Sequence, residues 1–245
     1  MITQWYITGD CHSDFSRFYK LNEAVPENEV WGVIILGDCG LNFWLNKRDK
    51  KNKYRICDKY SKLRFYCVRG NHEARPEDVE GMAEMFDKDM CNWVYYEPQY
   101  PNIRYLKDGV EYLIGGKYSA LVCGGSYSVD KWYRLERQSM GYYSGWFANE
   151  QLSREEMENI TKTFKNKSFD LILAHTCPLS YQPTDLFLSF IDQSKVDNSM
   201  ELWFEDLIQQ IEFNKFLFGH YHQDRIINEK ARMFYSDIIN LEQIL

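Results

Sequence analysis

Short apolar runs alternate with longer amphipathic stretches along the chain. Runs of four to six apolar or aromatic residues that end near Gly, Ala or His predict buried strands. These strands are expected at residues 4–8, 32–36, 64–68, 120–123, 170–173 and 215–218. The stretches between them predict helices at residues 15–24, 48–62, 149–165 and 200–213. This alternation indicates an α/β fold whose loops deliver polar residues at the strand ends.

Local turn and cap signals refine this picture. Ser153 is followed three residues later by Glu156, a capping-box pattern that predicts a helix start. Asp108-Gly109 and Gly115-Gly116, each flanked by alternating residues, predict two hairpins. The segment between residues 124 and 148 is expected to be a loop.

Composition describes a folded α/β protein. The chain has 245 residues, of which 44% are hydrophobic and 27% charged. No stretch resembles a linker, so we expect a single domain over residues 1–245. The net charge of 29 − 36 = −7 argues against a protein that coats nucleic acid.

The sequence also indicates a compartment. The longest aliphatic run, residues 33–36, is far shorter than the roughly 20 residues of a membrane span. The N-terminal residues carry no signal-peptide pattern. Seven cysteines without a C-x-x-C pair do not resemble a disulfide framework. We therefore expect no membrane partner and a cytoplasmic protein with reduced thiols.

The candidate chemistry lies at the predicted strand ends. All five histidines occur there, and two aspartates and one asparagine occur beside them. These residues are Asp10, His12, Asp38, Asn71, His72, His175, His220 and His222. Each is weak evidence alone, but together they form a mixed nitrogen and oxygen donor set that suits divalent metal ions. A carboxylate that bridges two such ions holds them roughly 3.5–4 Å apart, a spacing used for displacement at phosphorus.

Five ordered blocks carry a family resemblance. They are Gly9-Asp10-Cys11-His12, Gly37-Asp38-Cys39-Gly40, Gly70-Asn71-His72-Glu73, Ala174-His175 and Gly219-His220-Tyr221-His222. The series resembles the calcineurin-like metallophosphoesterase superfamily, in particular its small bacterial and phage members. The resemblance implies a four-layer α/β sandwich, with two central mixed β-sheets flanked by helices and a two-metal site at the strand carboxyl ends.

The resemblance also implies a role for each residue. Asp10, His12, Asp38 and His222 would hold one metal, and Asp38, as the bridge, would hold the other with Asn71, His175 and His220. His72 would donate a proton to the leaving oxygen or stabilise charge there, and its pKa would lie near the operating pH. The alternative for His72 is an outer-sphere residue that only orients a ligand.

Candidate substrate contacts are less defined. Arg69 is a candidate phosphate contact, although an ion pair with Glu73 or another acid fits equally well. The segment from Gly124 to Arg134 resembles a stretch of the small bacterial and phage members, and Tyr127 and Arg134 could hold substrate there. The alternative is a packed connecting loop.

Two features limit the choice of activity. The protein phosphatase branch has an Arg where residues 41–43 stand here, so loss of this phosphate clamp argues against protein phosphatase activity. Glu73 favours a monoesterase slightly, because many diesterase branches have Asp there. The segment from Lys47 to Arg64 has a net charge of +7. It is either a solvated helix face or a patch that attracts an anionic substrate.

The sequence therefore predicts a phosphoesterase that hydrolyses a phosphate monoester by attack of metal-bound hydroxide. A phosphodiesterase or nuclease on the same scaffold is the first alternative, and a non-catalytic metal- or phosphate-binding module is the second. The expected cofactors are two divalent ions, Mn²⁺ first, with Fe, Zn or Ni as other choices. The expected partner is a phosphorylated substrate of unknown identity, and nucleic acid enters only as a substrate.

Overall fold

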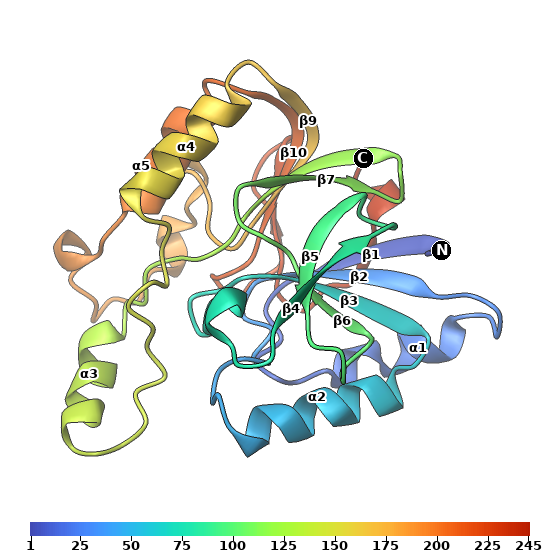
Figure 1. Cartoon of the computed structure of the whole chain (residues 1–245). Helices are drawn as coiled ribbons and strands as arrows, with labels where there is room; N and C mark the ends of the chain where they lie inside the picture. Colours follow the sequence, from blue (N-terminus) through green and yellow to red (C-terminus); the bar gives the residue numbers. More distant parts are fainter.

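Two β-sheets lie face to face at the centre of the molecule, and helices cover the outer face of each (Figure 1). The computed structural model covers all 245 residues. Helices α1 (Tyr19–Ala24) and α2 (Lys47–Lys59) flank one sheet, and α4 (Arg154–Phe164) and α5 (Ser199–Leu207) flank the other. This arrangement confirms the expected α/β sandwich.

The first sheet has seven strands. In spatial order they are β13 (Ile239–Asn240), β1 (Gln4–Thr8), β2 (Trp31–Leu36), β3 (Leu63–Val68), β6 (Ile103–Tyr105), β5 (Asn92–Tyr96) and β4 (Ala83–Asp87). The central strands β1, β2, β3 and β6 are parallel, and the outer strands are antiparallel. Every residue of β2 is buried, as expected for a parallel strand with both faces covered.

The second sheet has six strands. In spatial order they are β11 (Arg225–Ile226), β12 (Ala231–Met233), β10 (Glu212–Phe218), β9 (Ser168–Ala174), β8 (Tyr118–Cys123) and β7 (Val110–Ile114). Strands β8, β9, β10 and β12 run parallel. Because parallel strands end at one edge of a sheet, the polar residues that follow β9 and β10 lie near each other.

Three apolar clusters hold these layers together. One lies between the sheets and includes Ile34, Val68 and Leu173. A second packs α4 and α5 on the six-stranded sheet, and a third packs α1 and α2 on the seven-stranded sheet. None of the helices combines the length and apolar character that a membrane span requires. All seven cysteines are free thiols.

The predicted helices exist, with shifted ends. The capping box at the start of α4 is confirmed: Ser153 Oγ accepts from the Glu156 N–H at 3.2 Å, and Glu156 Oε2 accepts from the Ser153 N–H at 2.6 Å. Helix α5 ends at Leu207 and not at residue 213, because Glu212 and Phe213 pair with β9. Residues 16–18 form a 3₁₀ turn ahead of α1.

One predicted hairpin is confirmed and the other is wrong. Strands β7 and β8 form an antiparallel hairpin across Gly115 and Gly116. In contrast, Asp108-Gly109 connects β6 in one sheet to β7 in the other. The Asp108 carboxylate accepts hydrogen bonds from the Gly124 N–H and from Arg69 Nε, at 2.6 and 2.8 Å, so it fixes a crossover between sheets.

The segment from 124 to 148 is more regular than expected. It contains helix α3 (Lys131–Ser139), which has no buried residue and projects from the body of the molecule (Figure 1). Strands β4 and β5 and the short strands β11 to β13 were also absent from the sequence prediction. Their mixed exposure, as in β5, conceals the apolar signal that marks the central strands.

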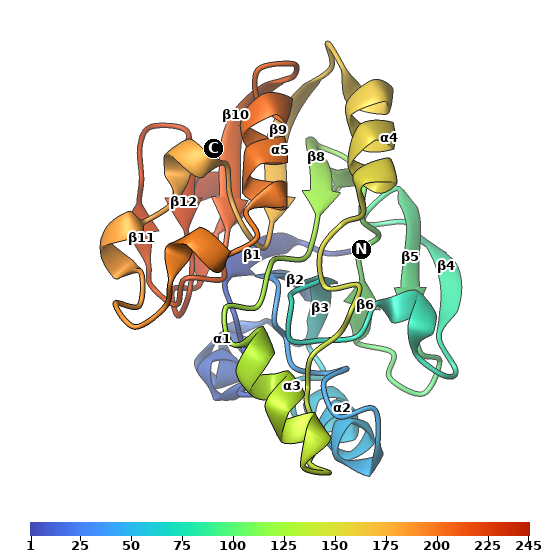
Figure 2. The same cartoon turned by 90° about the vertical axis from the view of Figure 1, so that its left-hand side faces the viewer.

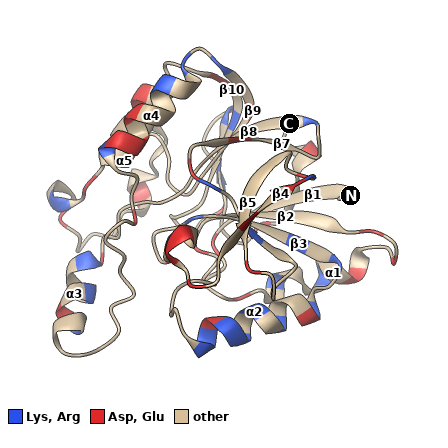
Figure 3. Ribbon diagram, viewed as in Figure 1, with Lys and Arg blue, Asp and Glu red and all other residues tan.

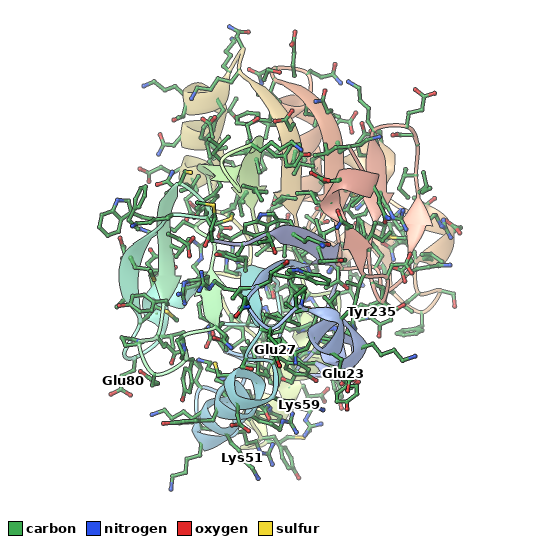
Figure 4. All side chains as sticks on the ribbon, turned by 90° about the vertical axis from the view of Figure 1, so that its right-hand side faces the viewer. Glu23, Glu27, Lys51, Lys59, Glu80 and Tyr235 are labelled. Atoms are coloured by element: carbon green, nitrogen blue, oxygen red, sulfur yellow. The ribbon has the colours of Figure 1, made fainter.

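The basic segment forms α2, the turn after it and the first two residues of β3. Figure 3 shows its Lys and Arg residues along the outer edge of α2, and Figure 4 shows Lys51 pointing away from the sheet. Lys53 is the exception. It is buried, and its Nζ donates to Asn42 Oδ1 at 2.6 Å and pairs with Glu97. This lysine therefore belongs to the interior and not to a solvated face.

Candidate functional site

All five histidines lie on one side of the molecule, where the central strands of both sheets end. This side faces the viewer in Figure 2. Strands β1, β2 and β3 deliver Asp10, Asp38 and Asn71, and β9 and β10 deliver His175 and His220. The parallel strand order thus places residues from five distant segments at one edge of the sandwich.

The backbone at this edge is strained. His12, Asp38, His220 and His222 have φ angles of 44°, 44°, 71° and 54°, in a region that residues with a Cβ rarely adopt. Such conformations cost about 1–3 kcal/mol each and persist where the surrounding structure enforces them. Their concentration here indicates a functional site.

Two glycines leave room for the carboxylates. A Cβ on Gly70 would collide with Asp38 Oδ1, and a Cβ on Gly219 would collide with Asp10 Oδ1. Both glycines stand in the sequence blocks described above. Their role is therefore steric: they let the backbone approach the carboxylates closely.

One group of candidate ligands comprises Asp10, His12 and His222. Asp10 Oδ2 lies 3.7 Å from His12 Nε2 and 3.3 Å from His222 Nε2. Asp10 is fully buried, whereas the two histidines are exposed. The three atoms could hold one ion at the mouth of the site.

A second group comprises Asp10, Asp38 and His175, all buried. His175 Nε2 lies 3.7 Å from Asp38 Oδ2 and 2.9 Å from Asn71 Oδ1. His175 Nδ1 lies 2.9 Å from the Leu36 carbonyl oxygen, which accepts a hydrogen bond from it. The unprotonated Nε2 can then bind a metal ion. The ring of His220 makes a T-shaped contact with the ring of His175, with 5.0 Å between the two centroids, so His220 lies beside this group.

Asp10 is thus the carboxylate common to both groups, whereas the resemblance assigns the shared position to Asp38. Each carboxylate has one oxygen fixed by the backbone. The His220 N–H donates to Asp10 Oδ1 at 2.9 Å, and the His72 N–H donates to Asp38 Oδ1 at 2.8 Å. The second oxygen of each remains directed at the histidines.

The electrostatics of the carboxylates indicate a cation site. Asp10 Oδ2 is buried and has no hydrogen-bond partner. Burial, then the charges of Asp10 and Glu73, raise the pKa of Asp38 well above its usual value. Burial opposes ionisation of Asp10 too, but His175 and His222 outweigh it and lower its pKa to about 2. A donor set of carboxylate, imidazole and amide groups around such an orphaned oxygen fits divalent metal ions.

His72 lines the cleft next to these groups, and its ring centroid lies 6.0 Å from that of His12. Its Nδ1 is buried without a partner. Burial, followed by the charge of Arg134, lowers the pKa of His72 to about 2, so the ring is neutral at neutral pH. This differs from the expected pKa near the operating pH, because the sequence did not reveal the buried position or the nearby guanidinium.

Arg69 does not face the cleft. It is buried, its Nε donates to Asp108, and its Nη1 and Nη2 donate to the carbonyl oxygens of Glu150 and Gly124. Arg69 thus forms an ion pair with an acid, Asp108, which was the alternative to a phosphate contact. Glu73 is also turned inward: it accepts from Cys39 Sγ at 2.8 Å and from the Gly70 N–H at 2.8 Å. Glu73 therefore does not line the cleft.

Of the two remaining candidates, Tyr127 lines the cleft and Arg134 does not. Tyr127 is largely buried. Arg134 Nε pairs with Asp130 at 2.7 Å, and Nη1 donates to the Gly145 carbonyl at 3.0 Å. Arg134 therefore acts on the site through its charge beside His72.

Sequence reasoning missed a chain of residues that orients Asn71. Asn71 Nδ2 donates to Ser128 Oγ at 2.8 Å, and Ser128 Oγ donates to Glu150 Oε2 at 2.5 Å. Ser126 Oγ lies 3.1 Å from His220 Nε2. The two serines follow β8 directly in Gly124-Gly125-Ser126-Tyr127-Ser128, so their place after a predicted strand was the available signal.

Comparison with known proteins places this geometry in context. The model of the calcineurin-like phosphoesterase family matches residues 5–224. No curated protein is significantly similar to the chain in sequence. One solved crystal structure is 14% identical, with 99% of this chain and 96% of that chain covered and a TM-score of 0.49. The phosphopantetheinyl hydrolase from Mycobacterium tuberculosis is 10% identical, with 95% and 88% covered and a TM-score of 0.42.

Proposed function

Because the chain belongs to the calcineurin-like phosphoesterase family of metal-dependent hydrolases, we propose that it uses two divalent ions to hydrolyse a phosphate monoester. We further propose Mn²⁺ as the native metal. The proposed site residues are those of the sequence analysis, with the exceptions of Arg69 and Arg134, which do not line the cleft.

One observation carries this proposal. Two groups of candidate ligands converge on Asp10, whose buried Oδ2 has no hydrogen-bond partner. A buried carboxylate oxygen without a hydrogen bond is costly unless a cation neutralises it. Two adjacent groups that share the Asp10 carboxylate support a dinuclear site.

When bound, the two ions would supply Lewis acidity and an activated water for attack at phosphorus. The protein's own residues orient and confine this chemistry. The Leu36 carbonyl fixes the His175 ring, and the pair Ser128 and Glu150 fixes the Asn71 amide. Rigid donors of this kind lower the cost of reorganisation during the reaction.

We propose that His72 handles the proton of the leaving group. Its neutral ring borders the cleft, and the negative charge of a phosphoryl group favours the imidazolium form. The ring can therefore take up a proton as the ester binds and return it to the leaving oxygen.

A paired assay tests the proposal. The protein is stripped with a chelator, reloaded with Mn²⁺, and assayed with phenyl phosphate and with bis(phenyl) phosphate, while bound metal is measured by elemental analysis. We expect two equivalents of Mn²⁺ and hydrolysis of the monoester that depends on metal. Faster diester hydrolysis would support the phosphodiesterase alternative, and metal binding without any hydrolysis would support the binding module.

A further inference from the structure

A cleft of about 310 Å³ opens beside the candidate metal site. Its lining includes Asp38, Asn71 and His72 and several residues of the segment 182–198. Its volume lies at the lower end of the range for small-molecule sites, about 300–1,000 Å³. A phosphoryl group at the metal end would direct its leaving alcohol along this cleft.

The side walls of the cleft are mainly apolar. Leu186, Phe187, Ile191 and Val196 contribute from one segment, and Val129 contributes from the loop before α3. Aliphatic and aromatic walls favour a leaving group with an apolar chain or ring.

The charged residues of the cleft are all acidic. Beyond the candidate ligand Asp38, they are Asp130, Asp197 and Glu201, and no Lys or Arg lines the cleft. Two cations of the neighbouring helix α3 have other partners. Arg134 pairs with Asp130, and Lys131 Nζ lies 4.8 Å from the ring centroid of Trp146. A polyanionic leaving group would therefore meet the carboxyl groups of Asp197 and Glu201, for which no ion pair with Lys or Arg is found.

Glu201 is the most informative of these acids. Its exposed fraction is 3%, and Oε1 accepts from Thr176 Oγ1 at 2.6 Å. Oε2 has no partner in the protein although Glu201 lines the cleft. A buried carboxylate oxygen of this kind calls for a hydrogen-bond donor, best a charged one. Burial raises the pKa of the Glu201 carboxyl, so its ionised form gains from a cationic neighbour.

We propose that the substrate is a small phosphate monoester whose leaving alcohol has an apolar body and carries a cationic amine. The body lies between the 182–198 segment and Val129, and the amine donates to Glu201 Oε2, with Asp197 as a second negative charge. This inference rests on the proposed phosphomonoesterase function. It excludes nucleic acids and polyphosphates as preferred substrates.

Three aryl phosphates of similar shape test the proposal. They are 4-ethylphenyl phosphate (neutral), 4-(2-aminoethyl)phenyl phosphate (cationic) and 4-(2-carboxyethyl)phenyl phosphate (anionic), with phenyl phosphate as the reference. We expect kcat/KM of the Mn²⁺-loaded protein to be about tenfold or more higher for the cationic ester than for the neutral one. The anionic ester should be the poorest of the three.

The variant Glu201→Gln keeps the acceptor for Thr176 and removes the charge. It should reduce the ratio of cationic to neutral kcat/KM by about tenfold. The variant Asp197→Asn, at an exposed position, should reduce the same ratio by a smaller factor. The control Glu229→Gln removes an exposed acid outside the cleft and should leave the ratio unchanged.

The outcomes separate the two proposals. If none of the esters, phenyl phosphate included, is hydrolysed by the Mn²⁺-loaded protein, the proposed function fails. If phenyl phosphate is hydrolysed but the cationic and neutral esters react equally well, the inference about the leaving group is wrong. An unchanged ratio in folded Glu201→Gln also overturns it.

Discussion

The Nε2 atoms of His12 and His222 lie 2.9 Å apart, although the two residues are 210 positions apart in the sequence. Both rings point their Nε2 at the unpartnered Oδ2 of Asp10. Two imidazole nitrogens and one carboxylate oxygen thus converge on one point, as the ligands of a bound ion do.

The first prediction concerns metal content. Asp10→Ala and Asp38→Ala each remove a buried carboxylate from the centre of the site, so we expect each to lose about two equivalents of Mn²⁺. His12→Ala removes a ligand at the mouth and should lose about one. Circular dichroism confirms that the variants are folded, and elemental analysis measures their metal content. Asp14→Ala, an exposed neighbour, is the control and should keep both ions.

The second prediction separates His72 from the ligands. His72→Ala should keep both ions yet lose about 10²–10⁴-fold in kcat, the usual contribution of a positioned acid or base. The loss should be smaller for 4-nitrophenyl phosphate, whose leaving group departs without a proton. Loss of metal in this variant would show instead that His72 holds a ligand in place.

The third prediction tests the close approach of Gly70 to Asp38. In Gly70→Ala the new methyl group displaces the carboxylate, so metal stoichiometry and activity should both fall. Gly116→Ala is the matched control: it also stands near the end of a strand, has φ +69° and meets no atom within 4 Å. The control should lose only about 1–2 kcal/mol in free energy of unfolding and keep its metals.

A fourth prediction concerns the pH dependence of folding. Burial opposes ionisation of Glu156, but the hydrogen bonds from Arg75 and Ser153 outweigh it and lower the pKa of Glu156 from 4.5 to about 2. The ionised carboxylate therefore stabilises the fold above about pH 4.5, and this contribution is lost as the pH falls toward 2. Denaturant unfolding of wild type and Glu156→Gln at about pH 7 and about pH 3 should show a stability difference that shrinks in acid. The difference for Glu155→Gln, an exposed neighbour, should change less.

The fifth prediction concerns the basic face of α2. We expect the triple variant Lys47→Glu, Lys50→Glu and Lys51→Glu to keep the salt dependence of kcat/KM of wild type between about 0.05 and 0.5 M. The reason is that these exposed lysines lie on the outer helix layer, whereas the cleft is lined by acids. A flatter profile in the variant would show that the helix attracts the substrate. Lys53 is left intact, since its reversal would place two acids together in the interior.

The sequence predicted the elements whose signal is local. Strand β2 and Asp38 could be found because a fully buried parallel strand is a continuous apolar run that ends at a polar loop. The connection at Asp108 from one sheet to the other could not be predicted, because its Gly-containing turn has the same local sequence pattern as a hairpin. Glu201 was also missed. Its helix reads as an ordinary amphipathic stretch, and only tertiary packing brings this residue to the cleft.

The candidate ligands and the walls of the cleft come from different kinds of backbone. The ligands follow the central strands, whereas the walls come mainly from the segment of residues 182–198 and the loop before α3, outside both sheets. Insertions or replacements in these loops leave the strand ends in place. Sequence changes in these loops can therefore alter which phosphate ester fits the cleft while the candidate metal ligands stay in place. The same separation allows a designed loop to be introduced without altering the strand ends.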